Sequence, residues 1–182
     1  METIKFEIVT LNWIETDFKS FPSASGLYQI YGDSPLYGKD TLLYIGQAMN
    51  LKHRSYSHFT SDRSFIGRQP NKTCRYAELD DELLDLVEQT LIVMHKPSFN
   101  SCNIIDVGPE IKARPIYIQN HGERGMLNLE VTNFYFLPDA VKQETITAYN
   151  SGFGASGERL NAASTTETPV SSSFGVTNNA EQ

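Results

Sequence analysis

The stretch that decides the fold is Tyr44-Ile45-Gly46-Gln47-Ala48-Met49-Asn50-Leu51-Lys52-His53-Arg54, in which a strand runs into a helix. The aromatic and aliphatic residues that lead to Gly46 predict a strand over residues 42–46. Asn50 is a favourable N-cap residue, so the sequence predicts a helix from residue 51 to about residue 59. The centre of the chain therefore combines both kinds of element, which favours an α+β protein.

A strand is also predicted upstream, at Gly26-Leu27-Tyr28-Gln29-Ile30-Tyr31, because β-formers alternate there and a turn-forming cluster follows at residues 32–35. We expect it to pair antiparallel with the strand at 42–46. A third strand is predicted at residues 73–79. Residues 61–72 are polar and broken by glycine and proline, so they are expected to form a loop.

The strongest helix signal follows Asp80, which we expect to cap the helix. Apolar residues recur there at helical spacing and define one face: Leu83, Leu84, Val87, Leu91 and Met94. Pro97 is expected to end the helix.

The flanking segments are read from the same signals. A short strand is predicted at residues 6–9 and a short helix at residues 13–21. Farther along, residues 115–118 and 127–131 are expected to form a hairpin around a turn-rich segment, followed by a final strand at Phe134–Phe136.

The chain has 182 residues, of which 40% are hydrophobic and 20% charged, with a formal net charge of -7. This charge argues against a protein that binds nucleic acid through bulk positive charge. No apolar run approaches the ~20 residues of a membrane span, and the first residues do not resemble a secretory signal. Two cysteines cannot build a disulfide framework, so we expect a reduced, cytoplasmic protein without a membrane partner.

Composition and element order divide the chain into four predicted parts. Residues 1–20 form an N-terminal lead-in, residues 21–105 a core domain, and residues 106–149 a β-rich extension. From residue 150 to residue 182, Ser, Thr, Asn, Gly and Ala dominate. Aliphatic residues are too sparse there to offset the entropy of ordering, so a disordered tail is expected.

The net charge hides a basic segment at residues 50–76, which contains six Lys or Arg residues and one Asp, a formal charge of +5. A concentrated positive segment on an acidic chain is a plausible phosphate footprint. We therefore expect contacts with the nucleic-acid backbone from Lys52, Arg63, Arg68 and Lys72.

Several short motifs occur in a fixed order. They are Gly26-Leu27-Tyr28, then Tyr44-Ile45-Gly46, then Arg54 and His58 four apart on one helix, then Glu88, and finally Asn100. This ordered set resembles the GIY-YIG nuclease family over about residues 20–103. The resemblance implies a small antiparallel three-stranded sheet flanked by helices, with the β-rich extension added at the C-terminal side.

Hydrolysis of a phosphodiester needs an activated water and neutralisation of the phosphoryl oxygens. Glu88 falls within an apolar arc of its helix, where a cation partner would explain a carboxylate. A carboxylate is a hard ligand suited to Mg²⁺ or Mn²⁺. The guanidinium of Arg54 suits the scissile phosphate.

The resemblance assigns the remaining roles. It implies that Tyr28 helps to activate the water and that Tyr44 positions phosphate or water. His58 is a further proton carrier, so either Tyr28 or His58 could be the immediate base. Gly46 is expected to permit close approach of the backbone to substrate, and Asn100 to brace the site.

One position departs from the pattern. Some relatives carry a lysine where this chain has Gln47, and Lys52 or Lys39 could replace it electrostatically.

The sequence thus predicts a Mg²⁺-dependent endonuclease that hydrolyses DNA phosphodiester bonds, of the restriction or repair type. A homodimer is a hypothesis, since two sites could cut both strands of a symmetric target. The alternative is a non-catalytic nucleic-acid-binding module with the same fold. A third reading is an interaction protein whose tail recruits a partner.

Overall fold

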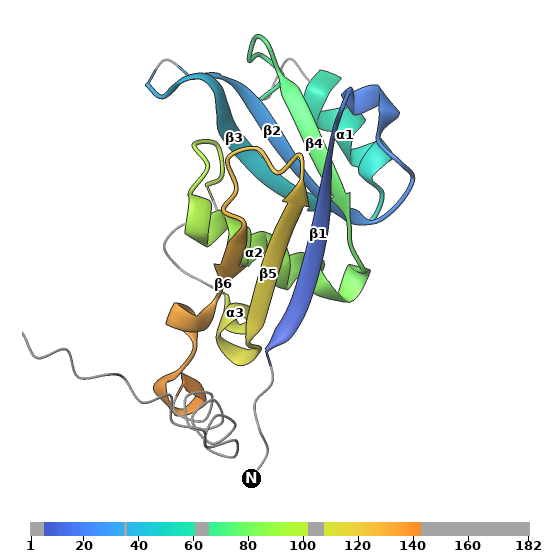
Figure 1. Ribbon diagram of the computed structural model, residues 1–182. Helices are drawn as coiled ribbons and strands as arrows, with labels where there is room; N and C mark the ends of the chain where they lie inside the picture. The colour runs from blue at the N-terminus through green and yellow to red at the C-terminus, as the bar shows by residue number, and fades with distance from the viewer. Residues whose placement is uncertain (1–5, 35, 61–65, 102–107, 143–182) are drawn as a thin grey trace, which may run out of the picture.

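The computed structural model describes residues 6–34, 36–60, 66–101 and 108–142 (Figure 1). Six strands form one mixed sheet in the order β3-β2-β4-β1-β5-β6. The strands are β1 (Glu7–Thr16), β2 (Gly26–Ser34), β3 (Gly38–Ala48), β4 (Thr73–Glu78), β5 (Ile116–Gly122) and β6 (Glu130–Thr132). The helices are α1 (Leu51–Thr60), α2 (Leu84–His95) and α3 (Pro109–Ala113), with single 3₁₀ turns η1 (Phe18–Ser20), η2 (Asp81–Leu83) and η3 (Phe134–Phe136).

The predicted α+β class and its three-stranded antiparallel unit are confirmed, because β2 pairs antiparallel with both β3 and β4. The sheet is larger than this unit. β1 adds to the far side of β4 in an antiparallel pairing, and β5 then pairs parallel with β1. The hairpin predicted within the extension forms from β5 and β6. The lead-in and the extension therefore continue the central sheet rather than standing apart from it.

The sheet has two apolar faces. One carries Leu27, Ile45 and Ala77 and packs against the buried side of α2. The opposite face carries Tyr28 and Ile30 and packs near Leu51 and Phe59 of α1. Figure 1 shows α2 behind β5, while α1 lies beside β4. Two neighbouring residues of β2 thus serve different cores, because side chains alternate across a strand.

The helix predicted over residues 13–21 is wrong. β1 extends through Thr16, and only η1 is helical in this segment. Burial alternates along β1, with Leu11 and Trp13 inside and Ile14 outside. Pairing with β4 on one side and β5 on the other satisfies the backbone, and this tertiary pairing overrides a weak local helix preference.

Two smaller predictions also need correction. Phe134–Phe136 is a 3₁₀ turn rather than a strand. Asn133 precedes it, and its buried side chain bonds the backbone of Ile111, Arg114 and Ile116. Asp80 makes no side-chain capping bond, because a 3₁₀ turn, η2, stands between it and α2.

The domain boundaries drawn from the sequence stay predictions, and residues 150–182 lie outside the described residues. Within the described ranges, no helix is long and apolar enough to cross a membrane.

We expect Trp13→Phe to lower the free energy of unfolding by about 1–3 kcal/mol. The Trp13 indole N–H donates to the side-chain oxygen of Asn120 over 2.9 Å, and both residues are fully buried. Phenylalanine would leave that oxygen without its donor. Urea denaturation measures the change, with Ile14→Val on the exposed side of β1 as the control. A loss no larger than the control's would contradict this account of β1.

Candidate active site

The register of β2 and β3 places the two motif tyrosines together. Tyr28 lies opposite Gly46, and Tyr44 lies opposite Ile30, so both phenols stand on the α1 side of the sheet. Their ring centroids are 5.9 Å apart. A Cβ at position 46 would lie 2.5 Å from the Tyr28 hydroxyl and 2.6 Å from a ring carbon of Tyr44. Glycine is therefore needed here to make room for the phenols, which differs from the predicted approach of substrate to the backbone.

Helix α1 brings the basic residues to these rings. Asn50 accepts a bond from the His53 amide over 3.0 Å, so the predicted N-cap is confirmed. Backbone bonds from Leu51 to Ala24 and from Lys52 to Pro22 fix the start of the helix beside the entry to β2. The ring of His58 then lies 6.0 Å from that of Tyr28 and 5.5 Å from that of Tyr44.

Arg54 is electrostatically coupled to every other residue of the predicted catalytic set. Partial burial opposes its charge, but interactions with Tyr28, Tyr44 and Glu88 outweigh burial and raise the pKa of the guanidinium. The same positive charge helps burial to lower the pKa of His58. Side chains from β2, β3, α1 and α2 thus interact with one cation, and their catalytic roles stay predictions.

Glu88 enters from α2. Burial raises the pKa of its carboxyl to about 7, against the opposing effect of a hydrogen bond from Gln47. The Gln47 amide donates to Oε2 of Glu88 over 3.1 Å and also to Oδ1 of Asp85. The Asp85 charge raises the Glu88 pKa further, while Arg54 lowers it.

The two candidate bases differ in environment. Burial strongly raises the pKa of Tyr28, and the nearby Tyr44 adds to this effect. Burial lowers the pKa of His58, which favours a neutral imidazole near pH 7. The Tyr28 hydroxyl interacts with the side chains of Arg54 and Tyr44. Among the described residues, Nδ1 of His58 has no hydrogen-bond partner, so it faces the two tyrosine rings with bonding capacity to spare.

The Asn100 side chain binds the backbone of β3, the edge strand that carries Tyr44. Its side-chain amide donates to the Ile45 carbonyl over 2.8 Å and accepts from the Ile45 amide over 3.0 Å. The preceding residue, Phe99, adds a backbone bond to Leu43. These bonds hold β3 on both sides of Tyr44, which is the arrangement that a bracing residue requires.

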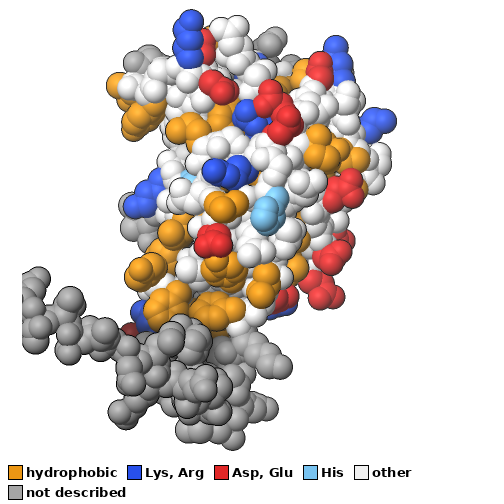
Figure 2. Space-filling view, viewed as in Figure 1, with side chains coloured by type: hydrophobic (Ala, Val, Ile, Leu, Met, Phe, Trp, Pro, Cys, Tyr) orange, Lys and Arg blue, Asp and Glu red, His pale blue; other side chains and the backbone are white. Residues whose placement is uncertain are grey.

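The predicted phosphate contacts differ in their surroundings, and their role stays a prediction. Lys52 and Arg68 are exposed, whereas Lys72 donates to the carbonyls of Gly67 and Gln69 and ties their loop. Arg63 lies outside the described residues. Figure 2 shows basic and acidic side chains interspersed on the face that it views.

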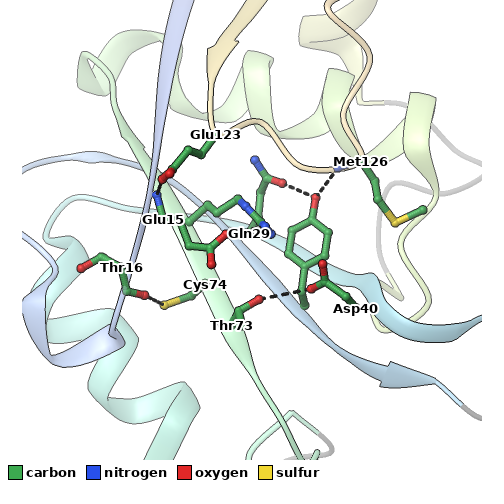
Figure 3. Close-up of polar contacts among 10 residues, drawn as sticks. Glu15, Thr16, Gln29, Asp40, Thr73, Cys74, Glu123 and Met126 are labelled. Carbon is green, nitrogen blue, oxygen red and sulfur yellow. Dashed lines mark hydrogen bonds and ion pairs between the residues drawn. The ribbon is translucent and has the colours of Figure 1, made fainter.

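Arg75, from the same basic segment, points into the protein. It is 8% exposed, pairs with Glu15 over 2.5 Å and lies 4.2 Å from the centre of the Tyr31 ring. The Tyr31 hydroxyl in turn donates to Gln29 and accepts from the Met126 amide (Figure 3). This residue therefore joins β4 to β1 and to the loop after β5, away from any role with phosphate.

A hard divalent cation fits the donor set. Glu88 presents one carboxylate within electrostatic reach of the Arg54 charge, and waters can complete the shell of Mg²⁺. Among the described residues, no group of three His, Cys, Asp or Glu side chains could enclose a metal. A single carboxylate from Glu88 suits an open site in which waters supply the remaining ligands.

Gln47 and Asp85 are the site residues that the sequence did not identify. The sequence pattern distinguishes Gln47 only as a departure from the lysine of some relatives. The signal available was the spacing of Asp85 and Glu88, three apart and so on the same side of α2.

Comparison with known proteins finds relatives for half of the chain, although no family model matches. This chain is 35% identical over 94 residues to UvrABC system protein C of Christiangramia forsetii, and the match covers 48% of this chain and 15% of that protein. It is 31% identical over 104 residues to UvrABC system protein C of Bacteroides fragilis, and this match covers 52% of this chain and 16% of that protein. The chain thus spans about one sixth of the length of these curated relatives.

Among solved structures, the chain is similar to the GIY-YIG N-terminal endonuclease domain of UvrC from Thermotoga maritima, bound to its catalytic divalent cation, magnesium. The identity is 21% and the TM-score 0.37, with 46% of this chain and 90% of that chain covered.

We expect Gly46→Ala to destabilise the protein by about 1–3 kcal/mol, because the added methyl group would overlap both tyrosine rings. The near-ultraviolet circular dichroism of the tyrosines should change with it. Gly108→Ala is the matched control, since its methyl group would meet only the flexible end of Gln89. Equal effects of the two substitutions would contradict the packing of Gly46 described here.

Glu88→Gln should make stability less dependent on pH. Folding raises the Glu88 pKa from 4.5 to about 7, so the carboxyl stabilises the fold when protonated and this contribution is lost as the pH rises through 7. In EDTA, the free energy of unfolding of the variant should exceed that of the wild type by about 1–3 kcal/mol near pH 8. This difference should vanish below pH 4.5. Urea denaturation across this range measures it; a difference independent of pH would contradict burial of the charge.

Proposed function

We propose that the chain is a member of the GIY-YIG nuclease family, an endonuclease that hydrolyses DNA phosphodiester bonds with the help of Mg²⁺ or Mn²⁺. The observation that carries this proposal is the convergence of two phenols, an imidazole and a carboxylate on the charge of Arg54. Arg54 and His58 come from α1 and Glu88 from α2.

Glu88 would hold the divalent cation. A bound cation supplies charge to a phosphoryl oxygen and lowers the pKa of a coordinated water. Deprotonated Glu88 is the form that binds a metal, and its pKa of about 7 means that binding should weaken as the medium becomes acidic.

Arg54 would bind the scissile phosphate. Its guanidinium can donate two parallel bonds to phosphate oxygens and keeps its charge throughout the reaction. The neighbouring phenols of Tyr28 and Tyr44 could then donate to the same phosphate or to the attacking water, because both lie on the Arg54 side of the sheet. These contacts would neutralise charge that develops on the phosphoryl group.

His58 is the better of the two candidate bases. A neutral imidazole can accept a proton near pH 7, and burial keeps His58 neutral. The Tyr28 phenol must first lose its own proton, and burial opposes that loss. We therefore assign proton acceptance to His58 and orientation of the water to Tyr28.

The kind of nuclease follows from the relatives. They are named UvrABC system protein C, which favours a repair type over a restriction type. The predicted homodimer stays a prediction, and sedimentation with and without DNA would test it.

The test of the function is cleavage of supercoiled and linear DNA by the purified protein, with Mg²⁺, with Mn²⁺ and with EDTA. We expect Glu88→Ala and Arg54→Ala each to lower the rate roughly 100-fold or more, because each removes a charge that acts on the transition state. Glu130→Ala on β6 and Arg114→Ala after α3 are matched, exposed controls. His58→Gln should lower the cleavage rate roughly 100-fold or more. Tyr28→Phe should lower this rate by a smaller factor.

Three results would count against the proposal or one of its assignments. Equal cleavage by Glu88→Ala and the wild type would remove Glu88 from the metal site. Tight DNA binding without scission, with any sequence in a random library and either metal, would support the non-catalytic binding module instead. A larger loss with Tyr28→Phe than with His58→Gln would reverse the two assigned roles.

A further inference from the structure

Gln47 makes contacts that the proposed mechanism does not use. It lies on β3 next to Gly46, but its side chain points to the other face of the sheet, toward α2. Its amide nitrogen donates to Oε2 of Glu88 over 3.1 Å and also to Oδ1 of Asp85. A side-chain amide carries two N–H donors on one nitrogen, so it can serve both carboxylates at once.

The two carboxylates would repel each other without such a donor. Asp85 and Glu88 are three apart on α2 and therefore share a face, where like charges are unfavourable. The Asp85 charge indeed acts on Glu88. The amide is neutral, so it holds both acids in place while leaving their two negative charges uncancelled.

The side chain at this position therefore affects the charge of the site as well as its geometry. A lysine could donate to the same two oxygens, but its ammonium would cancel one of the two charges. Glutamine adds no positive charge that would compete with a cation. One oxygen of Glu88 is also restrained by the amide, which limits the rotamers that the carboxylate can adopt.

We propose that Gln47 is a positioning residue that fixes Glu88 beside Asp85 and so prepares this pair of carboxylates to bind a divalent cation. The inference rests on the proposed function, because it concerns the metal site of that reaction. It assigns Asp85 to the site as a second negative charge, with Glu88 remaining the ligand.

The experiment measures Mn²⁺ binding to the DNA-free protein by electron paramagnetic resonance of the unbound ion. The variants are Gln47→Met, which keeps the length of the side chain but removes its donors, Asp85→Ala, and the two combined. Gln119→Met is the matched control, since Gln119 lies on β5, which three strands separate from β3 in the sheet. Glu88→Ala defines the background without the site.

We expect each single variant to weaken Mn²⁺ binding roughly threefold to tenfold, because this factor corresponds to the free-energy cost of immobilising one side chain. The double variant should weaken it by much less than the product of the two factors, because both substitutions break one hydrogen-bonded unit. In cleavage assays, the Mn²⁺ concentration for half-maximal rate should rise by the same factor. The rate at saturating Mn²⁺ should change less than about twofold, a split that general loss of folding would not produce.

The possible failures are distinguishable. If the wild type binds Mn²⁺ through Glu88 and Gln47→Met binds it equally well, the inference about Gln47 is overturned while the proposed function stands. Multiplicative losses in the double variant would also overturn it, since independent residues would then be acting. If the wild type shows no binding that depends on Glu88, the metal site of the proposed function fails, and the role of Gln47 falls with it.

Discussion

The structure depends on the antiparallel register in which Tyr28 of β2 lies opposite Gly46 of β3. This pairing puts a bulky phenol across from the one residue type without a side chain, and it brings the Tyr44 ring alongside. A shift of one residue would turn both phenols to the α2 face, because side chains alternate along a strand. The bonds from Asn100 and Phe99 to β3 hold the same register from the open edge.

Burial around this pairing has a common electrostatic result. It raises the pKa of Tyr28 and Glu88 and lowers that of His58, so each group is moved toward its neutral form. Arg54 is the positive charge that opposes this trend for the two acids. Perturbed groups that gather around one cation are typical of functional sites. Among the described residues, the buried Nδ1 of His58 has no partner, which favours the functional interpretation.

The sheet extends well beyond the part that carries the site. β1 links β2, β3 and β4 to β5 and β6, and Trp13 and Arg75 contribute to that link through Asn120 and Glu15. The continuity of the sheet explains how β5 and β6 can stabilise the candidate site without contributing residues to it. It also explains why the basic segment is not a single surface, since Arg75 serves the interior.

Local sequence alone determined the strands at Tyr28 and Tyr44, the N-cap at Asn50 and the apolar side of α2, because each follows from neighbours a few residues apart. It also identified the candidate site residues, through the order and spacing of the motifs. Tertiary structure decided the rest. Residues 13–16 became strand through pairing with β4 and β5, and Gln47 met Asp85 and Glu88 across 38 and 41 residues of chain. Such contacts depend on which elements pack together, and no periodicity within a single segment records that choice.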